Sequence, residues 1–185
     1  MKAVRGDCIL LVIDVQDKLV GSVAEHIKVA ENIKALVKVS SLLGIPIVAT
    51  EQEKLGGTIT GIMALLKDAK PFLKLSFSCC DAGGFIERLR GLNRKTIIIC
   101  GIEAHICVLQ TSLDLMELGF KTFVVNDAVS SHASGDCDSA VERMRGEGAV
   151  ITTTESLIFE LMGKAGTPEF KSILDIVKER RRTLS

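Results

Sequence analysis

Short, continuous apolar runs alternate with longer stretches at helical spacing through most of this sequence. Residues 8–13 are an unbroken aliphatic run, which predicts a strand buried on both faces. Further strands are expected at 45–50, 71–75, 96–100, 121–126 and 149–153, with helices at 26–43, 62–67, 85–92, 105–118, 136–147, 156–162 and 168–182. This alternation predicts a single α/β domain spanning 1–185, a Rossmann-like three-layer α-β-α fold with a six-stranded parallel sheet.

Polar residues stand where several of these strands end. In open parallel sheets, ligands bind beyond the carboxyl ends of the strands. The residues at those positions are Asp14, Thr50 to Gln52, Lys74, Gly101 with Ile102, and Asn126 with Asp127. We therefore expect a site at this edge of the sheet.

The overall charge excludes several classes of partner. The 23 basic residues balance 23 acidic ones, so no net field would hold nucleic acid or an anionic membrane. The chain has no Trp or Tyr on which bases could stack. No apolar run is long enough for a membrane span, and the first residues show no signal-peptide pattern. We expect a cytoplasmic protein with a small-molecule substrate, and no nucleic-acid or membrane partner.

Six scattered cysteines predict reduced thiols rather than a disulfide framework. Cys8 and Cys100 lie within predicted strands and are expected to be packing residues. Cys107 lies in the first turn of the 105–118 helix, where the helix N-terminus and a nearby ammonium would lower the thiol pKa below the ~8.5 of a free cysteine. The alternative is a buried, inert cysteine. The remaining thiols, Cys79, Cys80 and Cys137, are weaker candidates, and the sequence assigns no role to Cys79 or Cys80.

Asp14 and Lys74 each allow a plain structural interpretation. Asp14 follows the first strand and could cap a helix, and Lys74 ends the third strand and could be a surface lysine at a sheet edge. The three histidines show no metal-ligand spacing, so we expect neither a metal nor another cofactor.

Taken together, these residues resemble the isochorismatase-like cysteine hydrolases. The matching pieces are Asp14-x-Gln16, Lys74, Gly101-Ile102-Glu103-x-x-x-Cys107-Val108-x-x-Thr111, Gly119 and Val125-Asn126-Asp127-Ala128. The resemblance covers nearly the whole chain. Thr50-Glu51-Gln52 and the Gly-Ile-Glu-Ala spelling look closest to the branch of isochorismatase domain-containing proteins.

The resemblance implies a role for each matching residue. Cys107 would be the nucleophile, Asp14 the general base and Lys74 the cation that tunes both. A cis peptide would join Ile102 to Glu103, and the backbone N–H groups of Glu103 and Cys107 would form an oxyanion hole. Around the substrate it implies Gln16, Leu19, Gln52, Phe77 and His105, although for His105 an exposed or capping role is an open alternative.

Departures from the family pattern narrow the activity. The segment Glu51-Gln52-Glu53 holds no histidine, which argues against the metal site of a nicotinamidase. The presence of Cys107 favours acyl chemistry over vinyl-ether hydrolysis. We therefore expect a metal-independent cysteine hydrolase that cleaves a small amide or related C–N bond through a thioester. The alternatives are a non-catalytic binding member of the family and a hydrolase of an isochorismate-like vinyl ether.

A homo-oligomer is also expected. Family habit supports this expectation, as does an apolar stripe late in the chain formed by Leu157, Ile158, Leu161 and Met162.

Overall fold

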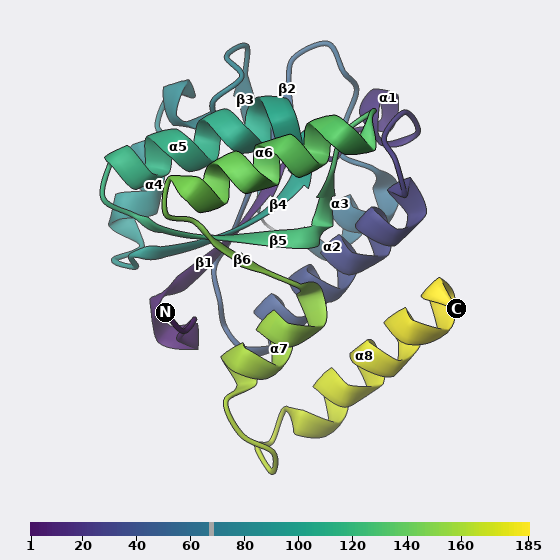
Figure 1. The fold of residues 1–185 in the computed structure, drawn as a ribbon. Helices are drawn as coiled ribbons and strands as arrows, with labels where there is room; N and C mark the ends of the chain where they lie inside the picture. Colours follow the sequence, from purple (N-terminus) through teal and green to yellow (C-terminus); the bar gives the residue numbers. More distant parts are fainter. Residues whose placement is uncertain (67–68) are drawn as a thin grey trace.

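A computed structural model describes residues 1–66 and 69–185, and its centre is a six-stranded parallel sheet (Figure 1). The strand order is β3-β2-β1-β4-β5-β6. The strands are β1 (Cys8–Ile13), β2 (Ile47–Gln52), β3 (Phe72–Lys74), β4 (Thr96–Ile102), β5 (Lys121–Ser130) and β6 (Val150–Thr152). The predicted α/β class and the six parallel strands are confirmed.

Helices cover both faces of this sheet, which gives the predicted three layers (Figure 1). One face carries α2 (His26–Leu42), α3 (Thr60–Leu66) and α7 (Thr154–Met162), with α8 (Phe170–Leu184) packed against α2. The other face carries α4 (Phe85–Gly91), α5 (Leu109–Glu117) and α6 (Ser134–Gly146). The short helix α1 (Asp17–Val20) follows β1.

The aliphatic run of β1 forms a central strand because both of its faces are covered. Leu10 and Val12 pack into the core under α2, whereas Ile9 and Leu11 pack into the core under α4 and α5. All six residues of the strand are buried. Alternate side chains therefore serve two separate apolar layers, which explains the absence of polar residues from this run.

Two predicted elements differ from the structure near the strand ends. The helix expected at 105–118 is divided into a π-helical turn, Ala104–Val108, followed by α5. Strand β5 continues through Asp127 to Ser130, beyond its predicted end at 126. The end predicted at Lys67 for the third helix lies outside the described residues.

The apolar stripe on α7 does not form an external surface. Its four residues, Leu157, Ile158, Leu161 and Met162, are buried in the chain's own core beneath the sheet. The stripe was therefore wrong as an argument for an oligomer, because these side chains already lie in the chain's own core, where α7 packs against α2 and β5.

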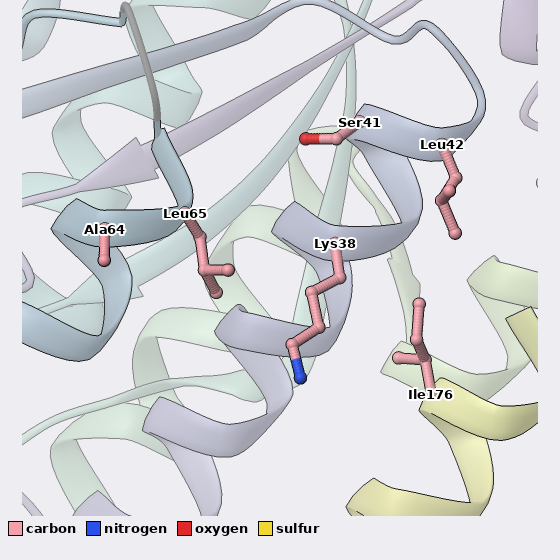
Figure 2. A pocket seen from close by; sticks show the side chains of 6 residues that line it. All are labelled: Lys38, Ser41, Leu42, Ala64, Leu65 and Ile176. Atoms are coloured by element: carbon pink, nitrogen blue, oxygen red, sulfur yellow. The ribbon is translucent and has the colours of Figure 1, made fainter. Parts of the chain in front are cut away.

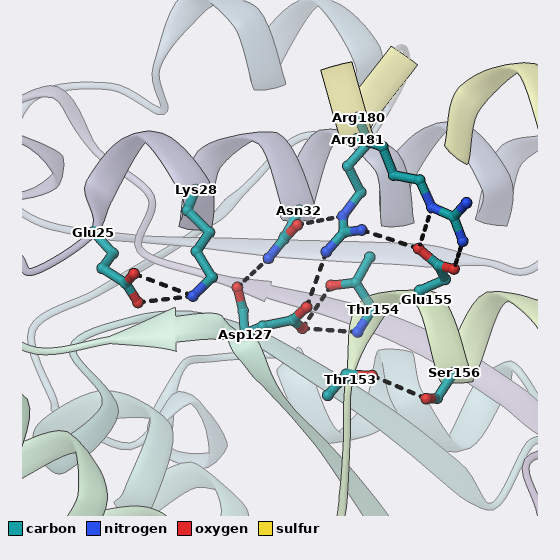
Figure 3. A network of polar contacts seen from close by, with 10 residues as sticks. All are labelled: Glu25, Lys28, Asn32, Asp127, Thr153, Thr154, Glu155, Ser156, Arg180 and Arg181. Atoms are coloured by element: carbon teal, nitrogen blue, oxygen red, sulfur yellow. Dashed lines mark hydrogen bonds and ion pairs between the residues drawn. The ribbon is translucent and has the colours of Figure 1, made fainter. Parts of the chain in front are cut away.

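A polar network joins α8 to the rest of this layer (Figure 3). Arg180 on α8 donates to Asn32 on α2 and pairs with Asp127 on β5 at 3.1 Å and with Glu155 on α7 at 3.4 Å. Asp127 Oδ1 also accepts from the backbone N–H and the hydroxyl of Thr154. Asn32 also donates to the carbonyl oxygen of Asp127, so Asp127 on β5 contacts α2, α7 and α8.

The parallel register brings the ends of four strands to one edge. Ile13 pairs with both Thr50 and Gly101, and Gln52 pairs with Lys74. Gly101 has φ +128°, and a Cβ there would lie 2.1 Å from the carbonyl oxygen of Ile13. Glycine is thus required for β1 and β4 to approach each other directly below the site.

Candidate active site

Asp14 follows β1 with a left-handed backbone, φ 50°, that directs its carboxylate into the interior. Its Oδ1 accepts a 2.7 Å hydrogen bond from the Thr50 hydroxyl, and its Oδ2 lies 2.6 Å from Lys74 Nζ. Among the described residues, no donor makes a hydrogen bond of good geometry to Oδ2. Oδ2 therefore keeps a lone pair that can accept a proton, and Asp14 is not a helix cap because Gln16 precedes α1.

Lys74 is buried at the end of β3, which rules out the surface interpretation. Its ammonium group donates to Gln52 Oε1 at 2.8 Å and to the carbonyl oxygens of Ser76 and Phe77 at 3.2 Å. It also lies 3.5 Å from Cys107 Sγ. Burial by itself lowers the pKa of Lys74, but the negative charge of Asp14 raises that pKa above its ordinary value.

Cys107 lies in the π-helical turn after β4, and 7% of the residue is exposed to solvent. Its thiol can therefore be reached, and it stands next to both Lys74 and Asp14. The structure thus brings Asp14, Lys74 and Cys107 together from the ends of β1, β3 and β4.

The prediction that the pKa of the Cys107 thiol is lowered is wrong. Burial and, to a smaller extent, the Asp14 carboxylate raise the pKa of Cys107 to about 12, and Lys74 opposes them only in part. At neutral pH Cys107 is therefore a protonated thiol beside a carboxylate. A thiol in this state attacks a carbonyl only if its proton is removed at the same moment, and the Asp14 carboxylate is the neighbouring group that could accept a proton.

Gln16 holds the loop that follows β2. Its side chain accepts from the N–H of Gln52 at 2.8 Å and donates to the carbonyl oxygens of Gln52 and Gly56 at 2.9 and 2.6 Å. It is fully buried and is absent from the cavity lining. We predicted a substrate contact for Gln16, but its hydrogen bonds are all to this loop.

A cavity of about 80 Å³ opens beside Cys107. It is lined by Asp14, Leu19, Gln52, Leu55, Phe77, Glu103, Ile106 and Cys107. Leu19, Gln52 and Phe77 thus line this cavity, and their contact with a substrate stays a prediction. His105 does not line the cavity, and its ring nitrogen Nδ1 lies 2.8 Å from Ser131 Oγ.

The peptide bond between Ile102 and Glu103 is cis, at the position that the resemblance implies. The Glu103 side chain extends to the cavity wall, and its Oε2 accepts a 2.8 Å hydrogen bond from the N–H of His132. The oxyanion hole from the N–H groups of Glu103 and Cys107 stays a prediction.

Several residues near the site were not assigned a role from the sequence. Thr50 orients the Asp14 carboxylate, and Cys79 Sγ lies 3.6 Å from the Thr50 hydroxyl. Burial raises the pKa of Cys79 to about 11, so this thiol is a packing neighbour at neutral pH. Leu55 and Ile106 form apolar walls. Thr50 could have been found from its position at the end of a predicted strand, but no comparable signal identifies Leu55 or Ile106.

A larger hollow of about 340 Å³ lies between α2, α3 and α8, away from the strand ends (Figure 2). It is lined by Lys38, Ser41, Leu42, Ala64, Leu65 and Ile176. Lys38 is the charged residue in this lining, and it already forms an ion pair with Glu179 at 3.0 Å. Asp14 and Cys107 line the smaller cavity and not this hollow.

Glu51, near the end of β2, holds the loop that follows this strand. Glu51 Oε1 accepts from the N–H and the hydroxyl of Thr58 at 2.7 and 2.8 Å.

Over residues 1–66 and 69–185, no three or more His, Cys, Asp or Glu side chains form a group that could hold a metal ion. In those same ranges, none of the helices combines the length and the apolar character needed to cross a bilayer.

Comparison with known sequences gives a consistent result. The pattern of the isochorismatase domain matches residues 8–156. The secreted isochorismatase effector Isc1 of Phytophthora sojae is 42% identical over 179 residues, which are 92% of this chain and 84% of that protein. Isochorismatase domain-containing protein 2A of Mus musculus is 38% identical over 174 residues, covering 92% of this chain and 82% of the mouse protein.

Solved structures share the fold over almost the full length. The MAR1 ribonuclease from Caenorhabditis elegans superposes with a TM-score of 0.91 at 32% identity, covering 96% of this chain and 93% of that one. The Escherichia coli YcaC gene product, described as an octameric hydrolase of unknown specificity, has a TM-score of 0.91 at 23% identity, covering 100% and 95%.

Proposed function

This chain belongs to the isochorismatase family, on the side of the isochorismatase domain-containing proteins, and from that premise we propose that it is a cysteine hydrolase of small amides. Cys107 is the nucleophile, Asp14 is the general acid and base, and Lys74 is the cation that fixes Asp14 beside Cys107. The proposal includes no metal, because the polar groups beside the cavity are already engaged with one another.

In the first half of the reaction, Sγ of Cys107 attacks the amide carbonyl carbon as its proton passes to Asp14 Oδ2. The carbonyl π electrons move to oxygen, and this oxyanion is stabilised by backbone N–H groups at Glu103 and Cys107. Collapse of the tetrahedral intermediate breaks the C–N bond. Asp14 returns its proton to the leaving nitrogen, so an amine departs and a thioester remains.

In the second half, Asp14 takes a proton from water as the water oxygen attacks the thioester carbon. Breaking the C–S bond releases a carboxylic acid, and the proton on Asp14 returns to Cys107. One amide and one water give one acid and one amine, and the enzyme is regenerated.

The observation that carries this proposal is the position of Lys74 Nζ, 2.6 Å from Asp14 Oδ2 and 3.5 Å from Cys107 Sγ, beside a cavity that reaches the thiol. A buried lysine in contact with both groups fixes the base beside the nucleophile. An inert packing cysteine has no need of such an arrangement.

Acyl transfer from p-nitrophenyl acetate, followed by intact-mass and peptide mass spectrometry, tests the proposal. We expect an acetyl group on Cys107 that forms and then disappears as acetate is released. Cys107→Ala should abolish both, while Cys137→Ala, which removes a half-buried thiol elsewhere, should retain both. Persistence of turnover in Cys107→Ala, or no acetyl group on Cys107, would overturn it.

The same experiment separates the alternatives. A non-catalytic binding member would form no transient acetyl enzyme, and a vinyl-ether hydrolase would not depend on Cys107. The ribonuclease named in the C. elegans structure is not proposed here. A cavity of about 80 Å³ is too small for a nucleotide, and the chain's formal charge is +0.

We also propose a homo-oligomer. Leu73, Leu75 and Phe77 are exposed apolar residues along the edge strand β3 and the segment after it, and the E. coli neighbour is described as octameric. A monomeric mass by light scattering at micromolar concentration would contradict this. One domain over 1–185 and a cytoplasmic location stay predictions, and one relative is described as secreted.

A further inference from the structure

The walls of the cavity restrict what can reach Cys107. Its volume of about 80 Å³ corresponds to about five to eight water-sized groups, since one such group takes ~10–15 Å³. Leu19, Leu55, Phe77 and Ile106 supply apolar surface. An acyl group of a few aliphatic carbons fits this space easily, a benzoyl group with its eight non-hydrogen atoms reaches the upper end of that range, and a bicyclic acyl group exceeds it.

The charged side chains that line the cavity are both acidic. Asp14 lies on one wall, and the Glu103 carboxylate lies on another, where the N–H of His132 holds it. In the described part of the chain, no Arg, Lys or His lines the cavity. An anionic substrate would therefore meet two carboxylates.

The Lys74 ammonium group and the Gln52 side-chain amide lie near the cavity, but their existing contacts leave them unable to offset this repulsion of a substrate carboxylate. An ammonium group has three protons, and Lys74 already contacts Asp14, Gln52 and the carbonyl oxygens of Ser76 and Phe77. Gln52 Nε2 in turn donates to the Leu75 carbonyl oxygen at 2.7 Å. A substrate carboxylate would thus have to displace existing partners before it could bind.

Given the proposed cysteine hydrolase, we infer that its substrates are amides of short, uncharged aliphatic acids, and that Glu103 is the residue that excludes acyl groups carrying a carboxylate. Phe77, at the mouth of the cavity, limits their size. Isochorismate-like dicarboxylates are excluded by both criteria.

Two alkylating reagents of equal size, one neutral and one anionic, measure directly how charge affects reaction at Cys107. Iodoacetamide and iodoacetate each react by loss of iodide as sulfur bonds to carbon, and the thiol proton leaves to Asp14 or solvent. For each, the rate at Cys107 is divided by the rate with 2-mercaptoethanol under the same conditions. We expect this normalised rate to be about tenfold or more higher for iodoacetamide than for iodoacetate at low ionic strength. The preference for iodoacetamide is the ratio of its rate to that of iodoacetate.

Glu103→Gln should bring the preference at Cys107 close to that of the free thiol. Its amide oxygen can still accept from His132, so the wall is retained. Glu142→Gln, which removes one acidic charge from the exposed face of α6, should leave the preference unchanged. Equal preference at Cys107 and the free thiol in the native protein would overturn the charge inference, as would an unchanged preference in Glu103→Gln.

Size selection is read from acetyl and benzoyl p-nitrophenyl esters. Acyl transfer to Cys107 should be about tenfold or more slower for benzoyl, and Phe77→Ala should restore it in part. Equal transfer of both groups would overturn the size inference. Loss of all acyl transfer with the charge preference intact would refute the hydrolase while leaving the selectivity of the cavity established.

Discussion

Lys74 Nζ lies 2.6 Å from Asp14 Oδ2, and both side chains are fully buried. Such a pair has been removed from water at considerable cost, so each charge depends on the other. Loss of either partner would leave an isolated buried charge, which typically destabilises a protein by about 3–5 kcal/mol. The pair is therefore a structural element as well as a part of the site.

Asp14→Asn and Lys74→Met should change the reactivity of Cys107 in opposite directions. Because Asp14 raises the pKa of the thiol and Lys74 lowers it, Asp14→Asn should speed iodoacetamide alkylation at pH 7 and Lys74→Met should slow it. Asp14→Asn should nevertheless abolish acyl turnover, since no base returns a proton to the leaving group.

Rates as a function of pH, with circular dichroism to verify folding, check this prediction. The control is Glu142→Gln, which should not shift the pH profile. Unchanged alkylation in a folded Lys74→Met variant would remove Lys74 from the site.

Gly101→Ala should destabilise the protein by about 3 kcal/mol or more. The new Cβ would meet the carbonyl oxygen of Ile13 at 2.1 Å, and the backbone at φ +128° disfavours any side chain. Urea denaturation measures the loss. Gly91→Ala, where the added Cβ meets nothing within 4 Å, is the matched control and should be nearly neutral. A comparable stability for the two variants would contradict the close approach of β1 and β4.

The free energy of unfolding should fall between pH 9 and pH 11. Burial raises the pKa of Cys8 and Cys79 to about 11 and that of Cys80 and Cys107 to about 12, against about 9 when unfolded. In this window the folded chain holds more protons than the unfolded one, so stability decreases as pH rises. The stabilisation is complete below about pH 9.

Each such thiol should lower the free energy of unfolding by up to about 1.4 kcal/mol per pH unit. Urea titrations from pH 8 to pH 11 under reducing conditions measure the slope, and the chain contains no Tyr to add to it. Cys8→Ala should make the slope shallower. A flat profile across this window would show that the thiols do not gain protection on folding.

Arg180→Ala should loosen α8 from the sheet layer. The variant removes contacts to Asn32, Asp127 and Glu155, for a loss of about 2–3 kcal/mol (Figure 3). Hydrogen exchange of the α8 amides should accelerate more than exchange in β4. Arg182→Ala, an exposed neighbour on the same helix, should leave both unchanged. Protection of α8 in Arg180→Ala would mean that apolar packing alone holds this helix.

The convergence of Asp14, Lys74 and Cys107 could be predicted because parallel strands place their carboxyl ends at one edge. Asp14 and Lys74 stand at or just after such an end, and Cys107 lies in the turn that follows β4, where the resemblance implied a nucleophile. The environment of Cys107 could not be predicted in the same way. Its pKa depends on burial and on distances to two charges, and the π-helical turn that carries it has no distinct sequence pattern.

Other differences between the predictions and the structure arise from contacts between segments that are far apart in the sequence. Gln16 was predicted to face a substrate, but the loop after β2 returns to it and uses all of its hydrogen-bonding groups. The α7 stripe has the composition of an interface, but it is buried in the chain's own core, where α7 packs against α2 and β5. A local apolar pattern shows that a surface is buried, but it does not show which surface covers it.

The cavity draws its reactive groups and its walls from different parts of the chain. Asp14, Lys74 and Cys107 stand at strand ends, whereas Leu55 and Phe77 come from the loops after β2 and β3. Loop sequences tolerate change far better than the strands of a central sheet. Substrate range in this scaffold is therefore open to laboratory evolution through a few loop positions, with the chemical step left in place.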